Sequence, residues 1–535
     1  MKLDRRHIGF KADEITYLDR KSIMLDRAML KLFELLRFDG RPPARWRKMT
    51  INVPELVKLM TEHPERFPGF AGHEEIAATW LRSDLLQVMN RGKGERETVV
   101  GPRPLHLNAY KLANASAVQD YGASDQVWAL LYHADSSLLN RLKDFFSPGL
   151  DYNEDQYDGT TELDLETYAI LGLVDQLKVS QTSTQRPPPI RPLCLGQGRL
   201  LADDLRALLA YTNRVPRHVL AGYMRTVIGL HLALFMLRLL RLLPAQVEAA
   251  LRGDLAPACP TEVEALRTCE SCPFAAEVVV DLSDDHKSGP GRLARASTAA
   301  ALDRLPEYIR AVYFINRLKD FAILHDRRHG TGGPLSVGSL LELLRTPPAN
   351  MDGFFDGEIL RVLELERNDE QDPIVELILS EDRLSSLEKF VELICIKRLA
   401  NERKQLIGLI DSLTQKNRRG GFMRQTAGRS APRWFVLDSH LLETLVQIAV
   451  VERQQDGTLR TRTILLDDFI EWLRRRYGFI VYAPAHRQVA PEEHEAWQEN
   501  EQRFRQRLHE IGFFTDLSDA YNSQTLRPRY QVEHA

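Results

Sequence analysis

Six basic residues crowd one short stretch of the chain, and between residues 411 and 437 only Asp411 opposes them. They are Lys416, Arg418, Arg419, Arg424, Arg429 and Arg433. The whole chain has a formal net charge of -3, so this cationic density is local. Arginine and lysine bind phosphate oxygens, glycines let the backbone follow a groove, and Phe422 and Trp434 could stack on bases. The stretch predicts a DNA contact, and the alternative is a plain Arg/Gly connector.

More arginines follow in the C-terminal part of the chain. Arg503 and Arg507 belong to a charged helix expected over residues 492–511, which Gly512 would end as a C-cap. Arg527 and Arg529 lie in a segment expected to form the second strand of a terminal hairpin with residues 513–517. Helices followed by a terminal hairpin are typical of a winged helix, a fold that serves both DNA binding and protein binding.

Three cysteines fall close together in a chain that has only five. Cys259, Cys269 and Cys272 include a CxxC pair, and Cys194 is available as a fourth ligand. Thiolates at this spacing bind zinc or an iron–sulfur cluster. The alternative is that these cysteines are unligated residues of a loop.

A third candidate site is acidic. Asp281, Asp284 and Asp285 follow a run of valines, which is how many nucleases present magnesium ligands. No downstream Glu-x-Lys pair completes that pattern, and a hydrated turn explains the same residues. The glycine-rich segments lack the Lys-Ser or Lys-Thr of a P-loop, so no nucleotide cofactor is expected. With no complete catalytic motif, the sequence favours a protein that is not an enzyme.

The elements that must position these residues are mainly helical. Apolar periodicity predicts helices over 13–38, 72–91, 124–146, 161–178, 216–244, 303–327 and 373–415. The run from Val227 to Leu243 contains His231, Arg238 and Arg241, so we expect a buried helix and no membrane contact. The low cysteine content and the absence of a signal-peptide pattern at the N-terminus predict a cytoplasmic protein.

Prolines and changes in composition suggest a multi-domain division. We expect an N-terminal helical domain, a proline-rich linker, a central helical domain with a cysteine-bearing insertion, the basic Arg/Gly segment and a winged-helix-like α+β domain. Their respective ranges are 1–179, 180–192, 193–410, 411–437 and 438–535.

The C-terminal residues also resemble a known group of proteins. The segments that carry the likeness are FIEWLRRRYG at 469–478, FRQRL at 504–508, GFFTDLSDA at 512–520 and RPRY at 527–530. They resemble the tail of poorly characterised proteins from bacterial multi-gene anti-phage islands, notably methylation-associated defence operons. The likeness covers roughly the last 100 residues. It implies an accessory subunit that acts beside methyltransferases, ATPases or nucleases, and its motifs carry no known chemistry.

Together these observations predict a non-catalytic DNA-binding and scaffolding subunit of a bacterial anti-phage defence complex, with DNA and other subunits as partners. Two alternatives stay open. One is a metal-dependent nuclease that uses the acids at 281–285, and the other is a purely protein-binding adaptor.

Overall fold

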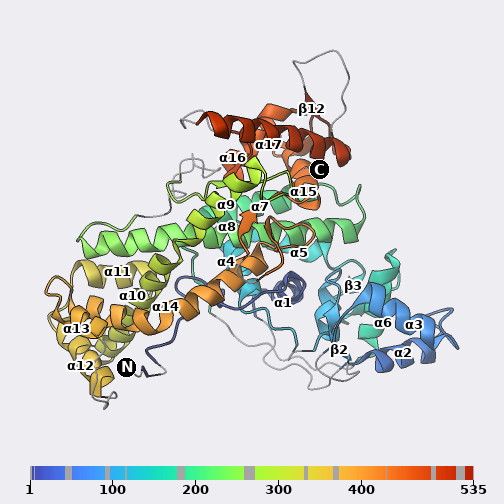
Figure 1. Ribbon diagram of the computed structural model, residues 1–535. Coiled ribbons are helices and arrows are strands. Elements are labelled where there is room, and N and C mark those ends of the chain that lie inside the picture. Colours follow the sequence, from blue (N-terminus) through green and yellow to red (C-terminus); the bar gives the residue numbers. More distant parts are fainter. Residues whose placement is uncertain are drawn as a thin grey trace.

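The computed structural model shows a mainly α-helical protein whose strands, among the residues described, form small two-stranded pairs (Figure 1). It describes residues 3–4, 6–41, 51–90, 97–114, 117–152, 154–177, 187–257, 259, 272–329, 335–364, 373–428, 431–483, 490–513 and 524–533. Every statement below concerns these residues. The mainly helical fold predicted from the sequence is confirmed.

One long helix, α8 (Arg217–Leu251), forms the centre of the molecule. Pro216 is the N-cap residue of α8, where a missing N–H removes no helical hydrogen bond. Pro244 lies inside the helix. By length and composition α8 could cross a membrane, yet 94% of its most apolar window is buried by other elements. Helix α8 is therefore a buried core helix, as the charged residues within its apolar run predicted.

Helices from both halves of the chain pack on α8. They are α1 (Leu25–Arg37), α4 (Ala123–Ala134), α7 (Leu195–Leu209), α10 (Leu305–His329), α11 (Val337–Arg345), α14 (Ser386–Leu413) and α15 (Ser439–Ala449). A single hydrophobic cluster contains residues from Phe10 to Val532. The division into domains expected from composition stays a prediction, and the packing across residues 180–192 is extensive.

Two groups of elements extend on either side of this centre (Figure 1). On one side lie α11, α12 (Met351–Glu364), α13 (Pro373–Ser380) and parts of α10 and α14. On the other side lie α2 (Val53–Glu62), α3 (Glu74–Trp80), α6 (Leu165–Asp175), the hairpin of β1 (Leu86–Asn90) and β2 (Glu97–Pro102), and the short pair β3 (Leu150–Asp151) and β4 (Gln156–Tyr157). Helix α5 (Ser136–Phe145) and the 3-10 helix η2 (Leu107–Leu112) connect the second group to α1 and α4.

Several predicted helices are interrupted in the structure. The helix expected over 13–38 begins only at Leu25. The helix expected over 72–91 ends at Trp80 and is followed by a short π-helix, η1 (Leu81–Leu85), and strand β1. Asp135 divides the helix expected over 124–146, because its carboxylate accepts a hydrogen bond from the Ser137 amide and caps α5. Ser385 and Glu388 form a capping box that begins α14 separately from α13.

The C-terminal part contains α15, the hairpin of β8 (Val451–Arg453) and β9 (Leu459–Thr461), β10 (Ile464–Leu465), α16 (Leu466–Tyr477), β11 (Phe479–Ile480), α17 (Pro491–Glu510) and β12 (Thr525–Leu526). Helix α17 ends before Gly512, whose φ is +77°, as the sequence predicted. Strand β12 pairs with β10, and residues 514–523 of the predicted terminal hairpin lie outside the described residues. A winged-helix arrangement is not confirmed.

Candidate nucleic-acid interface and an arginine-lined pocket

The basic segment is a folded hairpin in the structure. After α14 the chain turns through Gly420 into β6 (Met423–Gln425), which pairs with β7 (Arg433–Phe435). The Phe422 and Trp434 side chains are 1% and 3% exposed, so both rings belong to the core and are not available for stacking on bases. Arg429 lies outside the described residues.

The cations of this hairpin fall into two classes. Lys416 and Arg433 both bind the Asp411 carboxylate, at 2.5 Å and 2.7 Å. Arg418 and Arg419, in contrast, are exposed on the turn and form no ion pair with any described residue. Partly buried ion pairs therefore hold the hairpin together, whereas the two turn arginines are exposed to solvent.

The acidic loop after β5 (Val278–Val279) packs against this hairpin. Strand β5 and the residues after it lie between β11 and β7. The Val278 amide donates to the Gly478 carbonyl beside β11, and the Asp281 amide donates to the Phe435 carbonyl of β7. The buried Asn500 of α17 fixes the same strand, because its side chain donates to the Val280 carbonyl and accepts from the Leu282 amide. No local sequence pattern predicts this tether.

The three predicted metal ligands of this loop have other roles. Asp281 is fully buried, where its carboxylate accepts hydrogen bonds from Ser283 and from the Trp434 indole at 3.1 Å. Burial raises the pKa of Asp281. Asp284 binds Arg424 and Arg507, while Asp285 accepts from the Lys287 amide. Within the described residues no three His, Cys, Asp or Glu side chains are grouped to hold a metal ion.

Asp284 brings arginines from distant parts of the chain together. Arg424 of β6 approaches it at 3.3 Å and Arg507 of α17 at 2.8 Å. The Ser439 hydroxyl at the start of α15 accepts from Arg507, and the neighbouring Asp438 accepts from the Gly420 amide, so the arginine-bearing turn is adjacent. We call this surface the basic face, to which we add exposed Lys287, whose carbonyl accepts from Arg292, exposed Arg292 itself, and exposed Arg503, one helical turn before Arg507 in α17. Its residues are Lys287, Arg292, Arg418, Arg419, Arg424, Arg503 and Arg507.

Among the described residues, neither of the two predicted arginines near the C-terminus pairs with Asp284. Arg527 is exposed. Arg529 forms an ion pair with Glu443 of α15 and lies over the Phe513 ring, 4.5 Å from its centroid. Arg529 therefore fastens the C-terminus to α15.

The predicted cysteine ligands are divided between different surroundings. Cys194 is buried beside α8 in the main core, and its sulfur is 3.9 Å from an Arg238 nitrogen. Cys272 packs on Leu200 in a small separate cluster, and Cys259 is half-buried. Cys269 lies outside the described residues. The proposed zinc or iron–sulfur site thus stays a prediction.

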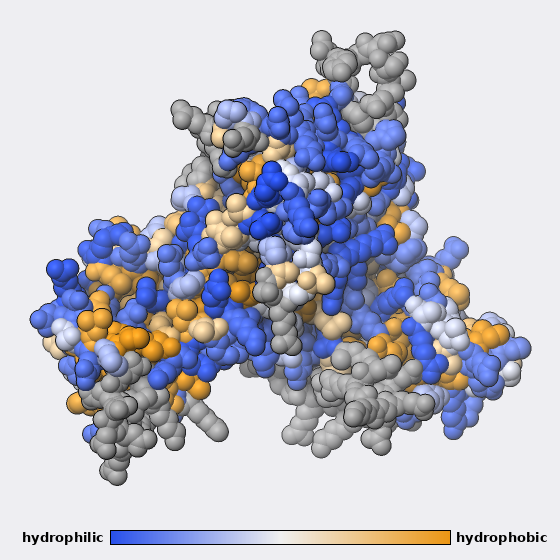
Figure 2. All heavy atoms as spheres, viewed as in Figure 1, coloured by the Kyte–Doolittle hydropathy of each residue, from blue (hydrophilic) through white to orange (hydrophobic). Residues whose placement is uncertain are grey.

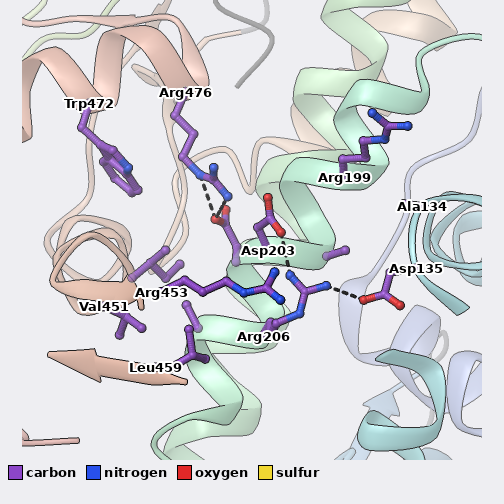
Figure 3. Close-up of a pocket in the computed structure, with 14 residues that line it drawn as sticks. Ala134, Asp135, Arg199, Asp203, Arg206, Val451, Arg453, Leu459, Trp472 and Arg476 are labelled. Atoms are coloured by element: carbon purple, nitrogen blue, oxygen red, sulfur yellow. Dashed lines mark hydrogen bonds and ion pairs between the residues drawn. The ribbon is translucent and has the colours of Figure 1, made fainter. Parts of the chain in front are cut away.

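A cavity that the sequence did not suggest lies between α7, the β8–β9 hairpin and α16 (Figure 3). Its volume is about 480 Å³, and four arginines from three elements line it. Arg206 binds Asp135 and Asp203, and Arg476 binds Asp204. Arg199 and Arg453 form no ion pair with a described residue. In Figure 3 the Arg453 side chain extends from β8 across the cavity toward Arg206.

A buried polar network supports one wall of this cavity. Asp204 is fully buried and accepts hydrogen bonds from His231 and from the Tyr477 hydroxyl, both at 2.7 Å. Burial acts to raise the pKa of Asp204, but the Arg476 charge and these hydrogen bonds outweigh it and lower the pKa. Burial lowers the pKa of His231, whose Nδ1 accepts from the Gln197 amide. In the sequence, His231 within an apolar run predicted a buried helix, but it did not identify Asp204, Tyr477 or Gln197 as neighbours in this network.

One family profile, described as methylation-associated defense system protein MAD7, matches the chain from residue 5 to residue 530. The chain belongs to this family. The likeness first seen at the C-terminus therefore extends over almost the whole chain, and membership in the family supports a role in anti-phage defence. No curated protein matches the chain.

Proposed function

We propose that this member of the methylation-associated defence family is a DNA-binding, non-catalytic scaffolding subunit of its defence complex. The observation that carries the proposal is the basic face, where Arg424 of β6 and Arg507 of α17, two segments distant in the chain, meet on Asp284. A surface built from fixed arginines is suited to binding the phosphates of nucleic acid.

The charge distribution on the basic face favours phosphate binding. Asp284 compensates Arg424 and Arg507 and fixes their positions, while Arg418 and Arg419 project without a counterion among the described residues. Fixed cations attract a polyanion and release its condensed counterions, a contribution that does not depend on base sequence. The winged-helix-like C-terminal unit belongs to this proposal because α17 supplies Arg503 and Arg507.

A separate surface supports the scaffolding part of the proposal. Leu360 of α12 and Leu377 of α13 are 59% and 69% exposed, and Ile374 is 55% exposed. Figure 2 shows hydrophobic residues gathered at the lower left of the molecule, where Figure 1 places α12 and α13. Exposed apolar patches of this kind are typical of protein–protein contacts, so we assign this surface to another subunit of the cytoplasmic defence complex.

The test of DNA binding is a salt titration with full-length protein and a duplex. Replacing both Arg418 and Arg419 by Ala should weaken binding to all sequences and reduce the slope of log K against log salt by about two, one per lost phosphate contact. The matched control is Arg383→Ala with Lys404→Ala, which removes two exposed charges from α14 and the turn before it. If both double variants bind alike, or if the wild type shows no binding at low salt, the protein is not a DNA-binding subunit.

The same samples test the absence of catalysis. Plasmid and single-stranded DNA incubated with the protein and Mg²⁺ or Mn²⁺ should stay intact, because Asp281 and Asp284 already have hydrogen-bond or ion-pair partners. Cleavage that disappears in Asp285→Ala, whose side chain is exposed, would establish the nuclease alternative instead.

A further inference from the structure

The arginine-lined cavity has an excess of positive charge that the fold does not use. Arg199, Arg206, Arg453 and Arg476 line it together with Asp135, Asp203 and Asp204. Arg206 pairs with two of these carboxylates and Arg476 with the third, so Arg199 and Arg453 have no ion pair among the described residues, and four arginines against three aspartates leave a net charge of +1 on the lining. The positive charge in the cavity is therefore available to a ligand.

The position of Arg453 is the most informative feature. Its side chain extends over the cavity toward the Arg206 guanidinium although like charges repel (Figure 3), and Arg453 remains exposed to solvent there. Hairpin register explains the direction, because Arg453 pairs with Leu459, and both side chains line the cavity. Two guanidinium groups that point toward one another form the forked arrangement of donors that suits phosphate oxygens.

We propose that this cavity binds a small phosphate-bearing ligand, with Arg453 and Arg199 supplying its uncompensated charge. Arg476 and Arg206 are held by their aspartates, so they form a rigid wall that needs no reorganisation when the ligand enters. Half-buried Trp472 also lines the cavity, where Phe469 stacks on its ring and the Arg476 guanidinium lies over it. A volume of about 480 Å³ accommodates a nucleotide as well as a free diphosphate.

This site is distinct from the basic face. The cavity lies by Ile448 and Val451 at the end of α15, whereas the basic face adjoins Ser439 at its beginning. Eleven helical residues separate the two ends by roughly 16 Å. Loss of function at one site should therefore leave the other intact.

Calorimetry with the full-length protein tests the proposal, using inorganic pyrophosphate and ADP as probes. We expect saturable binding of at least one probe, and a loss of about tenfold or more in affinity on Arg453→Ala or Arg199→Ala. Arg460→Ala is the matched control, since Arg460 is exposed on the same hairpin but is offset by one residue from Leu459 and faces away from the cavity. Tighter binding of ADP would identify a nucleotide, and equal binding would identify phosphate alone.

Two results would overturn the proposal. One is no binding of either probe at millimolar concentration. The other is binding that Arg453→Ala and Arg199→Ala leave unchanged. The DNA titration provides a further check, because Arg453→Ala should leave the salt slope of DNA binding at its wild-type value. A reduced slope would show that Arg453 contacts DNA and not a small ligand.

Discussion

At the scale of single residues, hydrogen bonds decide which charges are available and which belong to the fold. Trp434 shows this clearly: its indole donates to buried Asp281, so an aromatic residue among arginines serves the core. The sequence revealed the local excess of arginine and that Asp411 opposes it, but it did not reveal that Asp284 pairs with Arg424. Asp284 precedes Arg424 by more than a hundred residues, beyond any local pattern.

Buried His106 gives a prediction at this scale. Its Nδ1 accepts from the Asn108 amide while its Nε2 faces the Pro148 carbonyl, so the ring must carry its only proton on Nε2. Burial lowers its pKa to about 3. Below about pH 6.5 the unfolded chain binds a proton that the folded protein does not, so stability present above this pH is lost as the pH falls. At pH 5 the loss from this one group is about 2 kcal/mol.

Melting temperatures from pH 7.5 to pH 5 test this expectation. The His106→Gln variant should lose less stability over that range than the wild type, because Gln does not titrate. His73→Gln, at an exposed histidine, is the control and should follow the wild-type curve. Parallel curves for all three proteins would show that His106 takes up its proton in the folded state.

At the scale of elements, the sequence predicted most helices but not where they break. Apolar periodicity located α6, α8 and α10 because each buries one face or is wholly enclosed. It failed at η1 and β1, where local pairing with β2 replaces a helical turn. It also could not place β5 next to β11, since two short strands about 200 residues apart carry no signal of their pairing.

Gly478 makes that long-range pairing possible and gives a prediction about it. It follows α16 with φ +76°, and a Cβ there would lie 2.1 Å from the Ala276 carbonyl oxygen. Gly478→Ala should therefore add a steric clash to the strain of a left-handed backbone and separate β5 from β11. Gly512→Ala is a close control, because Gly512 has φ +77° after α17 and open space around it.

Comparing Gly478→Ala with Gly512→Ala separates the steric clash of the added Cβ from the cost of the left-handed backbone. Gly512→Ala should cost about 1 kcal/mol of stability, and Gly478→Ala clearly more, as measured by thermal or urea unfolding. Faster amide exchange at Val278 and Val280 is expected only for Gly478→Ala, because their amides donate to Gly478 and Ile480. Equal costs for the two variants would mean that β5 moves aside without penalty.

At the scale of the whole molecule, the chain crosses its predicted domain boundaries many times. The N-terminal segment lies against the distant α10–α14 group, where His7 binds Glu358 and Arg20 binds Glu402. Helix α4, which precedes the linker, packs tightly on α7, which follows it. Prolines in a sequence mark where helices cannot continue, but they do not show whether the helices on either side separate or pack together.

Splitting the chain at this linker tests how firmly the two sides associate. Residues 1–184 and 185–535, co-expressed as separate chains with one tag, should purify as a single complex that withstands 1 M salt, because their contact is mainly apolar.

Gly198 of α7 allows the closest approach, since a Cβ there would lie 2.7 Å from the Leu130 carbonyl oxygen of α4. Gly198→Val should therefore weaken co-purification of the split protein, whereas Gly222→Val, at a helix position with open space, should not. If the two pieces purify separately and each folds alone, residues 180–192 connect independent domains, and the α4–α7 contact contributes little to stability.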